Sequence, residues 1–291
     1  MVQRKSSQNV QMHRQSLDTG RPRRGKASRL PFLIAGGLLT LVAAALIATA
    51  LALPSGSDGV DDPASSASAP PTSGADFVAD AETGDTDQWC YVHSAIPVGV
   101  VTSPVRAGRY AFKSEIRDGP LIYDTERSEY ANGPGSCDKP MFRAGTETWT
   151  AVSVYLDAGF PEYSSWSLIA QWKEADGGSP PSQISVENEQ LAILGADSLD
   201  PRPRFPFGTI ERGRWIDFLV HHKWSTDQGI GFVEVIMDGE LVLPKTFTRT
   251  MDNSNPLFLN VGQYRDLANS GTAVLYIDEV RVGPTRQSVA P

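Results

Sequence analysis

The amino-acid sequence predicts an all-β domain in which two antiparallel sheets pack face to face, and three observations lead to this fold class. Segments of alternating apolar and polar residues recur after residue 75, which is the pattern of strands with one buried face. Clusters of Gly, Pro, Asn and Asp separate these segments, as turns between strands require. No stretch after residue 75 keeps the 3.6-residue period of an amphipathic helix. Together these features favour a jelly-roll (concanavalin-like) two-sheet β-sandwich.

The alternation places most of the expected strands. They are residues 148–156, 166–172, 184–186, 191–194, 215–224, 231–237, 257–264 and 273–282. Asp238-Gly239 follows the sixth of these and has the composition of a tight hairpin turn, so 240–242 should pair back onto it.

The strand at 215–224 shows how the pattern assigns faces. Its even-numbered residues, from Ile216 to Trp224, are mainly apolar and should pack in the core. Its odd-numbered residues include His221 and Lys223, and we expect this face to line a groove.

The N-terminus predicts export. Residues 1–29 hold eight basic side chains and one acidic side chain, whereas 30–53 hold no charge. A helix over 30–53 would be roughly 36 Å long, enough to cross the ~30 Å hydrocarbon core, with its basic flank in the cytoplasm. Ala50-Leu51-Ala52 has the form of a signal-peptidase site. The segment is therefore either a transmembrane anchor or a cleaved signal peptide, and the domain is either secreted or held at the membrane with its fold outside.

Residues 54–74 consist almost entirely of Ser, Ala, Pro, Gly and Asp. They lack the apolar surface that would offset the entropy of ordering, so we expect a flexible linker. The remaining residues, 75–291, are expected to form one β-sandwich domain that acts as a monomer.

The two cysteines, Cys90 and Cys137, both follow the export segment. A disulfide is the expected state there, and two thiols without paired histidines do not form a zinc site. The sequence contains neither the spacing of an EF-hand nor a phosphate-binding glycine loop. We therefore expect no cofactor, although a structural Ca²⁺ remains open in a domain this acidic.

Charge limits the possible partners. Of 26 basic and 34 acidic residues, 8 and 1 lie before residue 30, which leaves a formal net charge of −15 on the rest. This balance disfavours nucleic acid and repels any polyanion at long range. Binding an anionic polymer would need a local group of cations, and we expect Arg127, Lys173, Lys223 and Arg265 to lie on one face.

Three short strings point to a family. They are Arg127-Ser128-Glu129, Gln171-Trp172-Lys173 and Asn260-Val261-Gly262-Gln263-Tyr264. In order and spacing they resemble the active-site strands of the jelly-roll polysaccharide lyases, the group of the heparin lyase I-like, glucuronan and alginate lyases. The flanking segments 109–112, 215–218 and 276–280 extend the resemblance over about 75–284. Two positions depart from the family pattern: Lys173 stands where a His is usual, and Asn260 where a Lys is usual.

The resemblance implies cleavage of an anionic, uronate-containing polysaccharide (glucuronan, alginate or heparin-like) by β-elimination. It implies catalytic roles for Tyr264, Gln171, Lys173 and Arg127. We expect the substrate to contact, in addition, Glu129, His221, Lys223, Asn260 and Arg265.

The chemistry accounts for these residue types. The proton at C5 of a uronate lies next to a carboxylate, so it becomes acidic enough to remove only when that carboxylate is bound by donors and cations. Gln171 and Lys173, two apart on a strand, share one face, while Trp172 faces the core. Tyr264 is the expected proton-transfer group, and a phenol of ordinary pKa ~10 needs nearby cations to act as a base. His221 is a candidate for the missing imidazole.

Other interpretations stay open. Arg127 and Glu129 share a strand face and form a structural ion pair equally well, and a tyrosine at a strand end is commonly a rim residue. A non-catalytic, lectin-like sandwich would present aromatic platforms on its concave face without bringing Gln171 and Tyr264 together. A β-glucanase is disfavoured, because it needs acidic residues at alternate positions of one strand, and no such string is present.

Overall fold

The computed structural model describes residues 74–134, 137, 142–175 and 177–290. The chain divides into two units, Met1–Ser66 and Ala67–Pro291. The segments predicted at 1–29 and 30–53, and the linker at 54–74 except Gly74, lie outside the described residues, so their predicted roles remain predictions. Within the described ranges no helix has both the length and the hydrophobicity of a membrane span.

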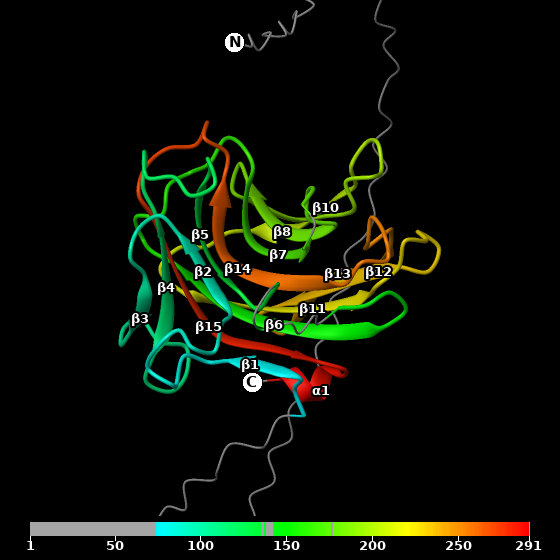
Figure 1. The fold of residues 1–291 in the computed structure, drawn as a ribbon, viewed down its shortest axis with the longest axis horizontal. Coiled ribbons are helices and arrows are strands. Elements are labelled where there is room, and N and C mark those ends of the chain that lie inside the picture. Colours follow the sequence, from blue (N-terminus) through cyan, green and yellow to red (C-terminus); the bar gives the residue numbers. More distant parts are fainter. Residues whose placement is uncertain (1–73, 135–136, 138–141, 176, 291) are drawn as a thin grey trace, which may run out of the picture. The chain divides into compact units, whose positions relative to one another are not determined.

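The described part of the second unit is a sandwich of two antiparallel sheets (Figure 1), which confirms the predicted fold class. The first, named here the outer sheet, has the order β13-β12-β11-β6-β15-β4-β3, with β1 also paired to β15. Its strands are β1 (Phe77–Ala79), β3 (Gly99–Val101), β4 (Ala111–Ile116), β6 (Glu147–Leu156), β11 (Trp215–Lys223), β12 (Phe232–Met237), β13 (Glu240–Phe247) and β15 (Ala273–Gly283).

The second, named the cleft sheet, has the order β10-β9-β8-β7-β14-β5-β2. Its strands are β2 (Tyr91–Ser94), β5 (Glu126–Ala131), β7 (Ser167–Glu174), β8 (Ser182–Glu187), β9 (Gln190–Leu194), β10 (Arg204–Thr209) and β14 (Leu257–Arg265). One short helix, α1 (Arg286–Val289), follows β15 and is capped by the side chain of Thr285.

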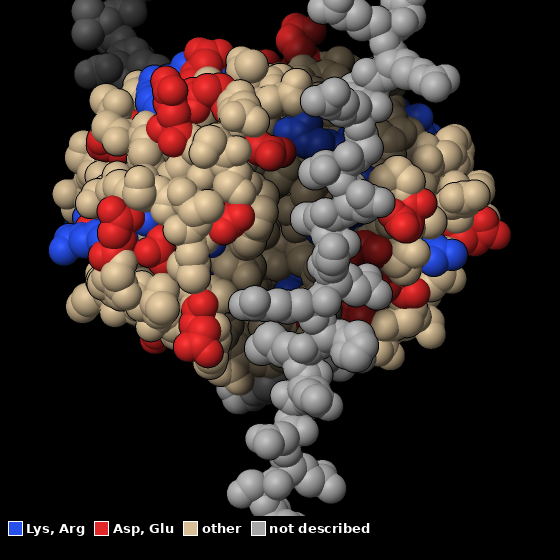
Figure 2. All heavy atoms as spheres, turned by 90° about the horizontal axis from the view of Figure 1, so that it is seen from above, with Lys and Arg blue, Asp and Glu red and all other residues tan. Residues whose placement is uncertain are grey.

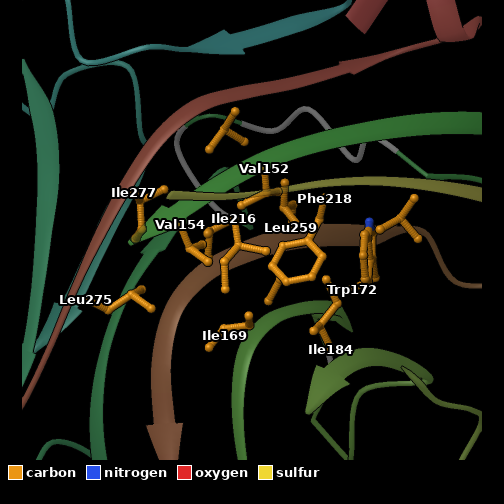
Figure 3. Packing of buried hydrophobic residues seen from close by; sticks show 14 of the residues in the cluster. Val152, Val154, Ile169, Trp172, Ile184, Ile216, Phe218, Leu259, Leu275 and Ile277 are labelled. Atoms are coloured by element: carbon orange, nitrogen blue, oxygen red, sulfur yellow. The ribbon is translucent and has the colours of Figure 1, made fainter. Parts of the chain in front are cut away.

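The core lies between the two sheets (Figure 3). Phe218 and Val154 from the outer sheet meet Trp172, Ile184 and Leu259 from the cleft sheet, and each is at most 2% exposed. Burial of each such side chain stabilises the fold by roughly 1.5–3 kcal/mol. Because successive side chains of a strand alternate in direction, a residue beside each core position faces outward. Because Trp172 points into the core, its neighbours Gln171 and Lys173 point to the opposite face of the cleft sheet.

The eight strands expected from alternation are all present, with ends within two residues of those predicted. The hairpin turn at Asp238-Gly239 is present as well, and both residues have positive φ. The strands that alternation missed are β1 to β5 and β10, although the resemblance had placed Arg127 to Glu129 on a strand, now β5. β1 and β3 have only three residues each, and β10 contains Pro206 beside a register shift.

The predicted disulfide between Cys90 and Cys137 is present, with the two Cα atoms 5.6 Å apart. It fastens the start of β2 to the segment that follows β5. The backbone N–H of Cys90 also donates to Ala131 O at 2.8 Å, so this edge of the cleft sheet is held both covalently and by the sheet ladder.

Two predicted substrate contacts lie in the wrong sheet. The alternation of 215–224 was correct, but β11 belongs to the outer sheet, so its outward face is remote from the three strings. His221 stacks on Trp149 with centroids 4.1 Å apart, and Lys223 Nζ donates to Gly145 O at 2.8 Å. The placement of His221 and Lys223 in a groove was therefore wrong, because alternation shows which residues share a face but not which sheet the strand joins.

Arg265 is a second correction. Its side chain is fully buried, where Nε donates to Glu126 at 2.6 Å and one terminal nitrogen to Asp118 at 2.8 Å. Another terminal nitrogen donates to the Tyr163 hydroxyl at 3.0 Å. Arg265 follows Tyr264 directly and so points to the other face of β14. It is a structural cation of the core and does not reach a substrate bound beside Tyr264.

Candidate active site

The strand order brings the three strings side by side. β14 lies between β5 and β7, so Tyr264 pairs with Arg127, and Asn260 pairs with Gln171. Arg127, Gln171, Lys173 and Tyr264 line one open pocket on the face of the cleft sheet turned away from the core. The view onto this side shows a hollow with Lys or Arg atoms inside it and acidic side chains on the surrounding surface (Figure 2).

A buried carboxyl group lies beside the pocket and contacts two of the residues that line it. Glu129 is fully buried, and burial raises its pKa against the opposing effect of Arg127, Gln171, Asn260 and Lys173. Gln171 Nε2 and the Asn260 side chain both donate to it, and Arg127 lies 3.4 Å away. Glu129 and Asn260 therefore lie behind Gln171 and orient it, in place of the predicted contact with substrate.

Gln171 retains unused hydrogen-bonding capacity. Its Oε1 is buried and has no partner among the described residues, while Nε2, which carries two hydrogens, donates to one Glu129 oxygen. Buried polar atoms are nearly always paired, and exceptions concentrate at functional sites. The second hydrogen of Nε2 is therefore the group that a carboxylate ligand would accept, because the unpartnered Oε1 is itself an acceptor.

Tyr264 is fixed by two neighbours. The Arg127 guanidinium lies 4.0 Å from the centroid of its ring, and Trp166 contacts the ring edge-on with centroids 4.9 Å apart. Arg127 is itself anchored, because its Nε donates to Thr125 Oγ1 at 2.8 Å. The phenol is therefore held in a defined orientation beside a permanent positive charge.

Gly262 explains the spacing of the third string. Its φ is +143°, and a Cβ there would lie 2.2 Å from Ser128 O on β5. The pairing of β14 with β7 also shifts register between Val261 and Tyr264. Only glycine allows β14 to approach β5 this closely, and the irregularity directs the Tyr264 side chain into the pocket.

Two further cations stand on the side of the pocket toward β8 to β10. Lys173 Nζ donates to Gly177 O at 3.0 Å and to Gly178 O at 2.5 Å. Arg202 Nε donates to Gly195 O at 2.8 Å, and burial lowers the pKa of its guanidinium, which stays charged at neutral pH. Of the four cations expected together, only Arg127 and Lys173 meet, and Arg202 takes the place of Lys223 and Arg265.

An imidazole that the sequence had not singled out lies on the same face. His93 on β2 pairs directly with Glu129 on β5, so its side chain extends to the side that carries Arg127. Burial, followed by the charge of Arg127, lowers the pKa of His93, so the ring is neutral at pH 7. Alternation in a four-residue strand is too short a signal to have placed it.

The described residues contain no group of three or more His, Cys, Asp or Glu side chains arranged to hold a metal ion. The donors that face the pocket are an amide, guanidinium groups, an ammonium group and a phenol, which bind anions. The arrangement is chemically suited to a carboxylate-bearing ligand.

A jelly roll whose pocket is lined by an amide, an arginine and a tyrosine has the fold and the residue types of the polysaccharide lyase sandwiches. A family model described as polysaccharide lyase matches residues 81–281, and the chain belongs to this family. The predicted resemblance is thereby confirmed. No curated protein matches the chain.

Solved structures agree on the fold. The endo-β-1,4-glucuronan lyase of the fungus Trichoderma reesei superposes with a TM-score of 0.62 at 22% identity, over 74% of this chain and 98% of that one. The cellulose-induced protein Cip1 superposes with a TM-score of 0.52 at 15% identity, over 72% of this chain and 98% of that one. At these identities the likeness establishes a shared fold.

Proposed function

We propose that this protein is an extracellular polysaccharide lyase that cleaves a 4-linked, uronate-containing polysaccharide by β-elimination. The observation that carries the proposal is the convergence of Arg127, Gln171 and Tyr264 on one open pocket. A purely structural role for the Arg127–Glu129 ion pair or for the Gln171 amide would not require the Tyr264 phenol at the same place. The glucuronan lyase with the same fold supports uronates as the substrate class.

The first step is capture of the uronate carboxylate. Gln171 donates its second amide hydrogen to a carboxylate oxygen, and Arg127 and Lys173 supply positive charge nearby. As the C5–H bond breaks, negative charge spreads from C5 into the carboxylate, and donors fixed in advance by Glu129 and Asn260 stabilise it without reorganising. The buried Glu129 thus acts as a positioning residue.

The second step moves two protons. Neutral His93 takes the C5 proton, the electron pair forms a C4=C5 double bond, and the C4–O4 bond breaks. The Tyr264 hydroxyl gives its proton to the leaving O4, and water then returns the proton of His93 to Tyr264. Burial and the charge of Arg127 lower the pKa of His93, so its imidazole begins in the neutral state that a base requires.

The place of action is part of the proposal. A Cys90–Cys137 disulfide suits an oxidising compartment, and the basic and apolar segments at 1–53 suit export. We propose a domain outside the cell, either released or anchored through 30–53.

A non-catalytic glycan-binding module is the alternative. Its supporting observation is a row of aromatic rings, Tyr91, His93 and Tyr123, on the edge of the cleft sheet. A binding module has no need for Gln171, Arg127 and Tyr264 to converge as well, so the lyase accounts for more of the site.

The deciding assay uses the full chain. It is incubated with polyglucuronate, alginate and heparin-type polymers while the ultraviolet absorbance of the unsaturated product is followed. The expected result is a rising signal on at least one uronate and none on a neutral glucan. Absence of signal on every uronate would rule out the lyase and leave the binding module.

A further inference from the structure

A strained turn presents an exposed tyrosine beside the candidate active site. Ile122 and Thr125 exchange two backbone hydrogen bonds, with N to O distances of 3.0 and 3.1 Å. Tyr123 and Asp124 form the turn between them, with φ of 53° and 57°. Turns of this kind ordinarily use Asn and Gly, and an aromatic residue with positive φ is uncommon. Tyr123 is nevertheless 70% exposed, so its ring does not stabilise the core in return.

The Tyr123 ring continues a row of aromatic side chains. It contacts His93 edge-on with centroids 5.8 Å apart, and His93 stacks on Tyr91 at 5.9 Å with an angle of 20° between the planes. Tyr91 and His93 alternate along β2, so both face the side of the cleft sheet that carries the pocket. We name Tyr91, His93 and Tyr123 the aromatic platform.

The aromatic platform is continuous with the site. Thr125, which closes the strained turn, accepts a hydrogen bond from Arg127 Nε at 2.8 Å. His93 pairs with Glu129 and lies close enough to Arg127 for that charge to lower its pKa. The platform therefore shares His93 with the proposed reaction and extends from it, along the edge strand β2, to Tyr91 and Tyr123. A polymer lying across the cleft sheet passes over both.

We propose that the aromatic platform is a sugar-binding subsite, in which Tyr123 stacks against the ring of the residue next to the one being cleaved. A pyranose whose substituents are equatorial presents axial C–H groups on its two faces, and these pack against the negative face of an aromatic ring. Carboxylates project from the edge of such a sugar, so stacking leaves them available to cations. The proposal rests on the proposed function, since it assumes that a uronate chain is the ligand.

The test compares three variants of the full chain on β-1,4-linked polyglucuronate and on its oligosaccharides of increasing length. Tyr123→Ala removes the ring, and Tyr123→Phe keeps the ring but removes the hydroxyl. Phe247→Ala is the control, because it removes an aromatic side chain that is 59% exposed on β13 of the outer sheet. Cleavage is followed by absorbance, binding by calorimetry, and folding by thermal melting.

We expect Tyr123→Ala to raise KM for the polymer about tenfold, equivalent to about 1.4 kcal/mol, with kcat unchanged. The effect should vanish on the shortest oligosaccharides that are still cleaved, because they reach His93 but not Tyr123. Tyr123→Phe and Phe247→Ala should behave as the parent does.

The outcomes separate this proposal from the lyase. If the parent cleaves polyglucuronate and Tyr123→Ala matches it at every length, or loses kcat alone, the subsite is refuted while the lyase stands. If the parent does not cleave but binds the polymer, and Tyr123→Ala loses that binding, the lyase fails and the subsite is supported. If the parent neither cleaves nor binds polyglucuronate, the subsite is refuted as well.

Discussion

At the scale of single residues, the pocket depends on one buried acid. Glu129 is fully buried and accepts hydrogen bonds from the side-chain amides of Gln171 and Asn260. These hydrogen bonds offset the free-energy cost of removing the acid from water. Gln171 and Arg127 are fixed by Glu129 and Thr125, which do not line the pocket, whereas Tyr264 is fixed by Arg127 and Trp166, which line it as well. Substitutions in the pocket should therefore affect the reaction, and substitutions beneath it should affect both reaction and stability.

Tyr264→Phe should lower kcat about 10²- to 10⁴-fold, the range that positioned proton transfer contributes. Thermal stability should change little, because the hydroxyl has no hydrogen-bond partner among the described residues. The ring contacts with Arg127 and Trp166 remain in the variant. Steady-state kinetics by absorbance would measure the effect. Tyr155→Phe, on β6 of the outer sheet, is the matched control, and equal activity of Tyr264→Phe and the parent would refute the assigned role.

His93 should set the acidic side of the pH profile. Burial and Arg127 lower its pKa below the ordinary value of 6.5, and the proposed base must be neutral. We expect kcat/KM to rise with pH and level off, with a midpoint below 6.5. His93→Ala should lose this dependence together with most of the activity. If the fall of kcat/KM at acidic pH persisted unchanged in His93→Ala, a group other than His93 would be responsible for it.

At the scale of elements, the site is made by the contact of three strands that are distant in the chain. β14 lies between β5 and β7, and its register against them decides which side chains meet. At Gly262, β14 lies so near β5 that an added Cβ would clash with the backbone of Ser128 and Glu129. The local irregularity, and not the strand as such, directs Tyr264.

Gly262→Ala tests this contact. A Cβ at 2.2 Å from Ser128 O forces β14 away from β5, in addition to about 1–3 kcal/mol of backbone strain. We expect a lower free energy of unfolding by denaturant and a large loss of activity. Gly119→Ala is the matched control, since Gly119 also has positive φ, at +101°, but has nothing within 4 Å of the added Cβ. Equal losses in the two variants would mean that the close approach is unimportant.

At the scale of the whole molecule, the two sheets are joined by a buried polar contact as well as by apolar packing. The Nε2 atom of His222, on β11 of the outer sheet, lies 2.9 Å from the Oγ atom of Ser182, on β8 of the cleft sheet. Its ring stacks on Trp224 with centroids 4.2 Å apart. Burial, and secondly His221, holds the pKa of His222 well below 6.5.

This contact makes stability depend on pH. The unfolded chain protonates His222 below about pH 6.5, whereas the folded chain excludes that proton, so the stabilising contribution is present above 6.5 and is lost as pH falls. Relative to His222→Phe, the parent should lose about 1.4 kcal/mol for each pH unit below 6.5. Denaturant unfolding at several pH values would measure both proteins. Parallel stability curves for the two proteins would contradict the prediction.

Prediction from sequence worked best where the signal was local. The long strands followed from alternation, the Asp238-Gly239 turn from its composition, and the shared face of Gln171 and Lys173 from their spacing. It failed for β11, because alternation does not record which sheet a strand joins: His221 and Lys223 lie on the predicted face, but in the outer sheet. It also failed for Arg265, which directly follows Tyr264 on β14 and therefore points to the opposite face, into the core.

The sequence by itself determined the fold class, the disulfide partners and the family, because period-two alternation, two cysteines and three ordered strings are local properties of the chain. Only the tertiary structure decided which side chains share the cleft. It brought Arg202 and His93 to the site, and it placed Glu129 and Asn260 behind Gln171. The physical reason is that a strand's neighbours are chosen by long-range packing and hydrogen-bond register, which the pattern of a single strand does not record.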